Sequence, residues 1–162
     1  AVPVFALCNP GRGDNFNPLY QNPELARRIF DTKFGQPLKE VLKVLTVGGK
    51  RPTSPIMEMI RAISVVEDFA PKGAKARRLI LFSDMLHNTP SFSQYQNHER
   101  FSKFRTTDYA RRAIPNLSGV DVEIIYLLRD GAGRHQTRGH AIFWEHYFNA
   151  TGARLQDLVP TP

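Results

Sequence analysis

Cysteine and long apolar runs are what this 162-residue sequence most clearly lacks. Cys8 is the only cysteine, so an intrachain disulfide is excluded. No apolar run approaches the ~20 residues that a membrane-spanning helix needs, so we expect no membrane span in this chain. With 41% hydrophobic and 23% charged residues, the composition is that of a globular protein, and the length suits a single compact domain over residues 1–162.

Acidic residues are outnumbered, with 22 Lys and Arg against 15 Asp and Glu and a formal net charge of +7. Residues 71–140 contain twelve basic and six acidic residues, which accounts for most of the excess. Such a stretch attracts anions, among them nucleic acid, phosphorylated ligands and acidic lipids. The candidate basic surface consists of Arg77, Arg78, Arg111 and Arg112. An ordinary solvated face is the alternative interpretation.

Apolar runs and helical periodicities alternate along the chain, with no internal repeat and no linker long enough to separate two domains. The run at 79–84 is continuously apolar, as in a central parallel strand buried on both faces. Strands are expected at 2–7, 79–84 and 120–128. Helices are expected at 23–34, where Gly35 ends the first, and at 38–45, 55–69, 99–113 and 140–153. The alternation predicts an α/β fold, a Rossmann-like layered sheet, mainly parallel, with helices on both faces.

Three segments are expected to meet at the carboxyl edge of this sheet, residues 8–17, 51–55 and 83–89, because ligand sites lie beyond the carboxyl ends of parallel strands. Asp84 is the leading candidate, since a carboxylate after a buried strand is costly unless it meets a metal, a cation or helix N-terminal amides. Its alternative role is to cap the following turn. Ser54 either adds a hydroxyl to the same centre or serves only as the N-cap of the helix that follows.

Patterns typical of catalysis are missing. The segment Val47–Ser54 is not a phosphate-binding loop, because Arg51 follows Lys50 and no glycine stands at the required upstream position. The five histidines include no i, i+4 pair of the kind that binds a metal. Cys8 has no histidine tied to it by sequence, and an inert thiol is the commoner case. The sequence therefore favours binding over catalysis.

The segments TSPIMEMI (residues 53–60) and RRLILFSDML (77–86) resemble the second and third metal-site motifs of von Willebrand factor A-like domains. In that family a helix start supplies a hydroxyl ligand and a strand end supplies an aspartate, and these positions fall on Ser54 and Asp84. The chain is also similar to uncharacterised bacterial proteins of this type in which CNPGRG, FSDMLHN and FWEHYFNATGA recur. The family's first strand, with its metal motif, is absent, so the domain is expected to lack its N-terminal strand. Met85 stands where a glycine usually follows the aspartate.

The resemblance implies a non-catalytic module that binds a protein partner at the carboxyl edge, with Mg²⁺ or Mn²⁺ held weakly by Ser54 and Asp84. The expected binding rim consists of Asn15, Thr53, Ser83 and His87. The alternative is a nucleic-acid-binding protein, or a metal-dependent nuclease, that uses the basic surface. A soluble protein of the cytoplasm or periplasm is expected.

Overall fold

The computed structural model describes residues 22–46, 53–66, 76–96 and 100–161. The chain divides into two compact units, residues 2–51 and residues 52–162. A single domain over 1–162 therefore stays a prediction. The strand expected at 2–7 lies outside the described residues. Among the described helices, none is long and apolar enough to cross a membrane.

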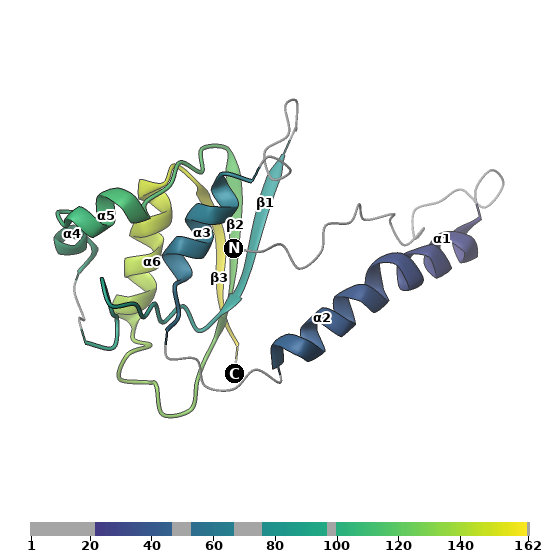
Figure 1. Cartoon of the computed structure of the whole chain (residues 1–162), viewed down its shortest axis with the longest axis horizontal. Helices are drawn as coiled ribbons and strands as arrows, with labels where there is room; N and C mark the ends of the chain where they lie inside the picture. Colours follow the sequence, from purple (N-terminus) through teal and green to yellow (C-terminus); the bar gives the residue numbers. More distant parts are fainter. Residues whose placement is uncertain (1–21, 47–52, 67–75, 97–99, 162) are drawn as a thin grey trace. The chain divides into compact units, whose positions relative to one another are not determined.

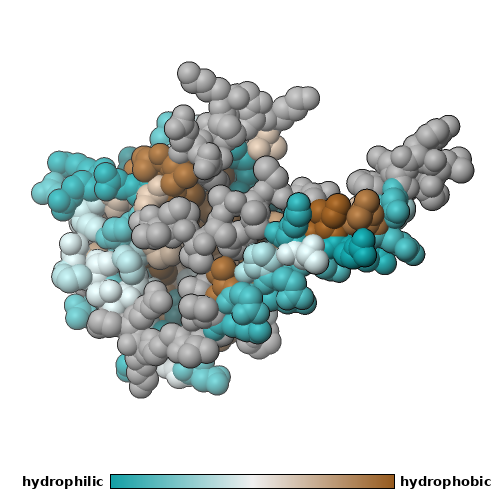
Figure 2. All heavy atoms as spheres, turned by 45° about the vertical axis from the view of Figure 1, so that its right-hand side comes forward, coloured by the Kyte–Doolittle hydropathy of each residue, from teal (hydrophilic) through white to brown (hydrophobic). Residues whose placement is uncertain are grey.

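The described part of the first unit is one helical segment. α1 (Pro23–Phe30) begins after Asn22, whose side chain accepts a hydrogen bond from the Leu25 backbone N–H at 3.0 Å. The π-helical segment η1 (Asp31–Gly35) leads directly into α2 (Gln36–Thr46), so the helix end expected at Gly35 is wrong. Pro37 has no N–H to donate to an α-helical turn, and the wider π turn stands immediately before it. Figure 2 shows apolar residues along one side of this segment and hydrophilic residues along the other.

The second unit is built on a parallel three-stranded sheet of β1 (Arg77–Ser83), β2 (Val120–Leu127) and β3 (Arg154–Thr161). The predicted α/β class and parallel sheet are confirmed. The strands lie in chain order with β2 in the middle, so both crossovers run in the same direction. Because such crossovers are right-handed, their helices belong on the same face. Figure 1 shows the crossover helices α4 (Phe101–Phe104), α5 (Asp108–Ala113) and α6 (Arg138–Ala150) on one side of the sheet. α3 (Ile56–Ser64), which precedes β1, lies on the same side.

Among the described strands, β1 lies at the edge of the sheet, so the central position expected for it is not confirmed. Leu79 is buried, whereas Ile80 and Phe82 are 44% and 72% exposed. The sequence also predicts helices on both faces of the sheet. This is not confirmed for the second unit, because its described helices all contribute to one core. The sequence does not predict β3, because it lacks a two-residue alternation of apolar and polar residues. The pairing of β3 with β2 is also irregular, with a shift of register between Val122 and Glu123.

Four helices cover the sheet: α3 (Ile56–Ser64), α4 (Phe101–Phe104), α5 (Asp108–Ala113) and α6 (Arg138–Ala150). The helix expected at 99–113 is two helices, because the Thr107 side chain caps α5 by accepting from the Ala110 N–H at 3.1 Å. α3 ends at Ser64, earlier than expected. α6 confirms the aromatic helix expected at 140–153, and Gly152 follows it with φ of +76°, a conformation suited to glycine.

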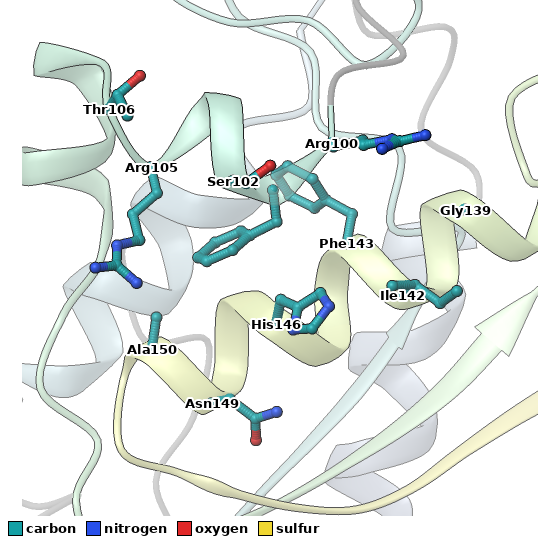
Figure 3. Close-up of a pocket in the computed structure, with 11 residues that line it drawn as sticks. Arg100, Ser102, Arg105, Thr106, Gly139, Ile142, Phe143, His146, Asn149 and Ala150 are labelled. Carbon is teal, nitrogen blue, oxygen red and sulfur yellow. The ribbon is translucent and has the colours of Figure 1, made fainter.

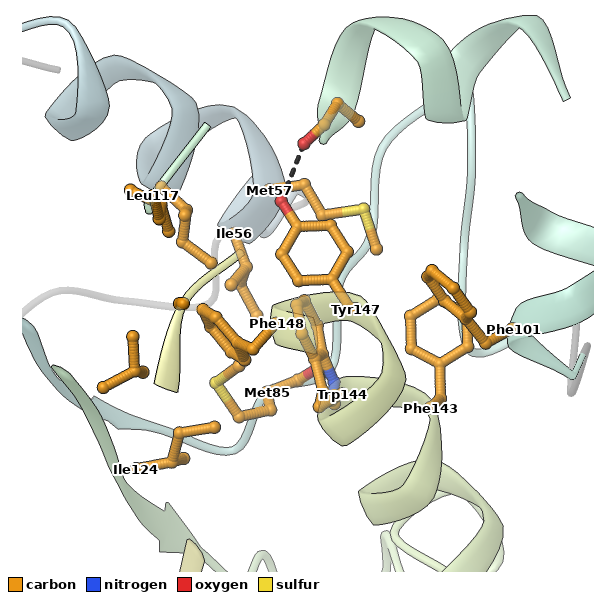
Figure 4. Close-up of a cluster of buried hydrophobic side chains, with 14 of the residues drawn as sticks. Ile56, Met57, Met85, Phe101, Leu117, Ile124, Phe143, Trp144, Tyr147 and Phe148 are labelled. Carbon is orange, nitrogen blue, oxygen red and sulfur yellow. Dashed lines mark hydrogen bonds between the residues drawn. The ribbon is translucent and has the colours of Figure 1, made fainter. Parts of the chain in front are cut away.

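The core lies between these helices and one face of the sheet (Figure 4). Trp144, Tyr147 and Phe148 of α6 are fully buried against Val120 and Ile124 of β2. The Tyr147 hydroxyl donates to the Ala113 carbonyl at 2.7 Å, so its one polar atom is paired in the interior. Phe101 and Phe104 also belong to the core, which is their commoner role at helical spacing. This packing holds the carboxyl ends of β1 and β2 in place.

Candidate functional site

An ion pair joins the segments that leave β1 and β2 at the carboxyl edge. Asp84 follows β1, and its Oδ2 accepts a hydrogen bond from the Arg129 guanidinium at 2.9 Å. The same nitrogen of Arg129 donates to the Tyr95 hydroxyl oxygen, also at 2.9 Å. Hydrogen bonding to Asp84 raises the pKa of Arg129 above its usual value. We call Asp84, Tyr95 and Arg129 the edge triad.

Gln136 fastens the backbone beneath the edge triad. Its amide nitrogen donates to the Leu127 carbonyl at 2.8 Å and to the Asp84 carbonyl at 3.2 Å. Its amide oxygen accepts from the Arg129 backbone N–H at 2.8 Å. One side chain thus satisfies backbone groups from the ends of both strands, which fixes the two loops relative to each other. The edge triad is therefore presented on a rigid base.

Met85 is strained at the same point. Its φ of +55° lies in the left-handed region that favours glycine, and its side chain is fully buried. Its carbonyl accepts hydrogen bonds from the Trp144 indole N–H at 2.9 Å and lies 3.2 Å from His140 Nε2. The core contacts of the side chain and the Trp144 hydrogen bond hold a conformation that costs about 1–2 kcal/mol. The turn after Asp84 thus follows a glycine-like path without a glycine.

The other expected site residues divide between edge and interior. Ser83 accepts from the Met85 N–H through its hydroxyl at 3.0 Å, and Thr53 is exposed. The backbone of Ser54 pairs with Asn88 in a short antiparallel bridge, and α3 begins at Ile56. Its expected role as N-cap is wrong, because the N-cap position is Pro55, which makes no side-chain cap. Asn15 lies outside the described residues.

His87 lies in the interior instead of at the rim. Its Nδ1 accepts from the Met57 backbone N–H at 3.3 Å, which places the proton on Nε2, 3.0 Å from the Tyr109 hydroxyl oxygen. Tyr109 in turn donates to a Glu58 oxygen at 2.6 Å. Burial lowers the pKa of His87 to about 4, although the Glu58 carboxylate opposes the shift. His87 is therefore neutral at pH 7 and ties α3 to α5, which explains why it does not face a ligand.

A divalent ion fits Asp84 poorly in this arrangement. One carboxylate oxygen accepts from the Leu86 N–H at 3.0 Å, which is the turn-capping role expected as the alternative. The other oxygen pairs with Arg129. Among the described residues, no group of three or more His, Cys, Asp or Glu side chains could hold a metal. Binding of Mg²⁺ or Mn²⁺ at Asp84 stays a prediction. Such an ion would have to displace the Arg129 guanidinium from the carboxylate.

The four arginines of the expected basic surface are divided between β1 and α5. Arg77 donates to the Ser118 carbonyl, and Arg78 pairs with Glu123. On α5, Arg111 pairs with Asp108 at 3.1 Å, whereas Arg112 lines a small cavity of about 230 Å³ beside Glu58. Nucleic-acid binding through these arginines stays a prediction, and three of the four already have protein partners.

Sequence reasoning missed Arg129, Tyr95 and Gln136 as members of the edge. Arg129 and Gln136 follow β2, whose carboxyl end lies at the same edge by the rule that selected the loop after β1. Applying that rule to the loop after residue 128 would have found both. Tyr95 had no comparable pattern, because it lies eleven residues beyond Asp84 and returns to the edge only through the fold.

In comparisons with known proteins, no protein-family model, curated protein or solved structure matches the chain. The resemblance to von Willebrand factor A-like domains therefore stays a prediction.

Proposed function

We propose that the chain is a non-catalytic binding module that engages a protein partner at the carboxyl edge of its sheet. One observation carries the proposal: the edge triad is fixed in place beside exposed apolar side chains. Phe82 is 72% exposed, and Leu127 and Leu128 at the end of β2 are also exposed. Exposed apolar surface next to ordered polar groups marks interaction sites.

The chemistry of the edge suits a protein partner. Tyr95 and Arg129 belong to the residue types that most often dominate binding energy at protein interfaces. Arg129 is hydrogen-bonded to both Asp84 and Tyr95, so less conformational entropy remains to be lost on binding. Phe82 offers a large apolar side chain for a partner to cover. We expect the partner to present apolar side chains to Phe82 and Leu128 and a hydrogen-bond acceptor to Arg129.

The resemblance to von Willebrand factor A-like domains supports the same edge of the sheet. It also implies Ser54 and Asp84 as ligands of Mg²⁺ or Mn²⁺, but Asp84 is paired with Arg129. The proposal therefore does not depend on an ion.

Site-directed photo-crosslinking tests the proposal. A photoreactive phenylalanine analogue replaces Phe82 or Leu128 in the full chain, which is then exposed to a lysate of the source cell. The control position is Val65, an apolar side chain that is 78% exposed at the far end of α3. We expect a protein that crosslinks from positions 82 and 128 and not from 65. That protein, once purified, should bind at least about tenfold more weakly to Phe82→Asp than to Val65→Asp.

Equal crosslinking from all three positions, or equal affinity of the two aspartate variants, would contradict a partner at the carboxyl edge. A circular dichroism spectrum unchanged in both variants shows that the comparison concerns binding and not folding. Both side chains are largely in solvent, so neither substitution is expected to unfold the chain.

A further inference from the structure

A groove of about 800 Å³ runs along α6 on the outside of the helix layer (Figure 3). Its α6 side is lined at positions 139, 142, 143, 146, 149 and 150, a spacing of three and four that marks one face of a helix. These positions span about 16 Å of helix at 1.5 Å per residue. The opposite wall comes from α4 and the turn after it. The groove is thus long enough for several residues of a peptide.

The floor of the groove is apolar and ordered. Phe143 packs against Phe101 with ring centroids 5.6 Å apart, and His146 stacks on Phe101 at 6.0 Å. Ile142 is 40% exposed in the groove, while both phenylalanines are almost fully buried beneath it. An apolar side chain placed over Ile142 and Phe143 would therefore be removed from water without disturbing the core.

Two arginines flank this floor. Arg100 lies toward the Gly139 end of α6 and Arg105 toward the Ala150 end (Figure 3). Within the part of the chain that the structure describes, neither guanidinium has an ion-pair partner, and none of the residues lining the groove is acidic. A complementary ligand therefore has an apolar middle and a negative charge on each side. A ligand with one anionic group would match only one end.

We propose that this groove binds an acidic peptide segment of a partner protein, with an apolar side chain against Ile142 and Phe143 and carboxylates on either side paired with Arg100 and Arg105. The site is separate from the edge triad. A single-stranded nucleic acid fits less well, because base stacking needs exposed aromatic faces and the two phenylalanines expose little of theirs.

Fluorescence anisotropy of the full chain with a labelled nine-residue peptide tests the proposal. The peptide has a leucine–phenylalanine–leucine centre with three glutamates on each side, and its control has glutamines in place of the glutamates. We expect the acidic peptide to bind about tenfold or more tightly than the control, with affinity that falls as salt rises. The Arg100→Glu and Arg105→Glu variants should each weaken binding about tenfold.

Lys103→Glu is the matched control variant. It lies on α4 between the two arginines and changes the net charge equally, but Lys103 does not line the groove. It should retain affinity within about twofold, and Ile142→Glu should lose binding because its carboxylate repels the peptide.

Three results would overturn the proposal. The acidic peptide could fail to bind at millimolar concentration, or Lys103→Glu could weaken it as much as Arg105→Glu does, which would indicate attraction to net charge alone. An oligothymidine that binds more tightly than the peptide, and loses affinity in the two arginine variants, would assign the groove to nucleic acid. Failure here leaves the proposed partner at Phe82 and Leu128 intact, because the two experiments use different residues.

Discussion

The two faces of the three-stranded sheet differ sharply, although both are built from the same strands. On the covered face, Val120, Val122 and Ile124 of β2 are fully buried under α6 and the other helices. On the open face, Ile80 and Phe82 of β1 remain exposed. Register places Phe82 beside Ile125, and Ile125 beside Val159, so an apolar row crosses all three strands. Among the residues that the structure describes, only one face of the sheet therefore contributes apolar area to the core.

Both faces of the sheet carry apolar side chains, so their exposure to water, and not their apolar character, distinguishes a binding surface from the core. An apolar side chain that is buried stabilises the fold, whereas one that stays in water is available to a partner. Charged residues mark the same division: Arg78 and Glu123 pair on the open face, next to the apolar row. The covered face specifies the fold, whereas both proposed binding sites, the open face near the carboxyl edge and the groove outside α6, use side chains that stay in water.

A pair of phenylalanine substitutions tests this comparison with the largest expected effect. Phe148→Ala removes a fully buried ring from the core and should lower the free energy of unfolding by about 3–5 kcal/mol. Phe82→Ala removes a ring that is 72% exposed and should change it by less than about 0.5 kcal/mol. Urea unfolding of both variants measures the two values. Equal losses would mean that the open face is covered in solution.

The pH dependence of stability tests the buried hydrogen bonds of His87 with Met57 and Tyr109. The pKa of His87 is about 4 in the folded chain and near 6.5 when unfolded, so the unfolded chain binds the extra proton first as pH falls. The contribution of neutral His87 to the free energy of unfolding is complete above pH 6.5. As the pH falls from 6.5 to 4, the protein loses roughly 3 kcal/mol of this free energy. Urea unfolding at pH 7 and pH 4.5 should show a smaller difference for His87→Asn than for the natural chain. An unchanged difference would assign the acid sensitivity to other groups.

Asp84 should have an intermediate effect, because it lies at the border between the two faces. Asp84→Ala removes both the Leu86 hydrogen bond and the Arg129 pair and should cost about 1–2 kcal/mol. A thermal unfolding scan with EDTA, Mg²⁺ and Mn²⁺ then tests the predicted ion. If an ion binds Asp84, its stabilising effect should grow in Arg129→Ala, where the carboxylate is released, and vanish in Asp84→Ala. A metal effect that survives Asp84→Ala would place the ion elsewhere.

The ion pair of the open face should have the smallest effect. The Arg78 side chain is 65% exposed, and water screens its attraction to Glu123. Arg78→Gln should change the free energy of unfolding by a few tenths of a kcal/mol, and the difference should shrink in 1 M NaCl. A loss above about 1 kcal/mol would show that the open face is more buried than its exposure indicates.

The aspartate at the end of β1 was predictable from sequence, and its partner was not. An apolar run that ends in Ser83 and Asp84 indicates a strand end with a functional carboxylate, and the structure places Asp84 there. Whether that carboxylate meets a metal, a cation or a turn depends on residues 45 positions away, since Arg129 approaches from the end of β2. His87 shows the same limit, because a polar residue in a loop looks exposed until Met57 and Tyr109 enclose it.

By itself, the sequence determined the α/β class, the strands at β1 and β2 and the aromatic helix α6, because each depends on a periodicity or an apolar run within a dozen residues. Only the tertiary structure decided that β1 lies at the edge of the described strands and that Arg129 pairs with Asp84. It also decided that Arg100 and Arg105 flank an apolar groove. These features come from contacts between distant segments, and local patterns carry no information about which neighbour a side chain will meet.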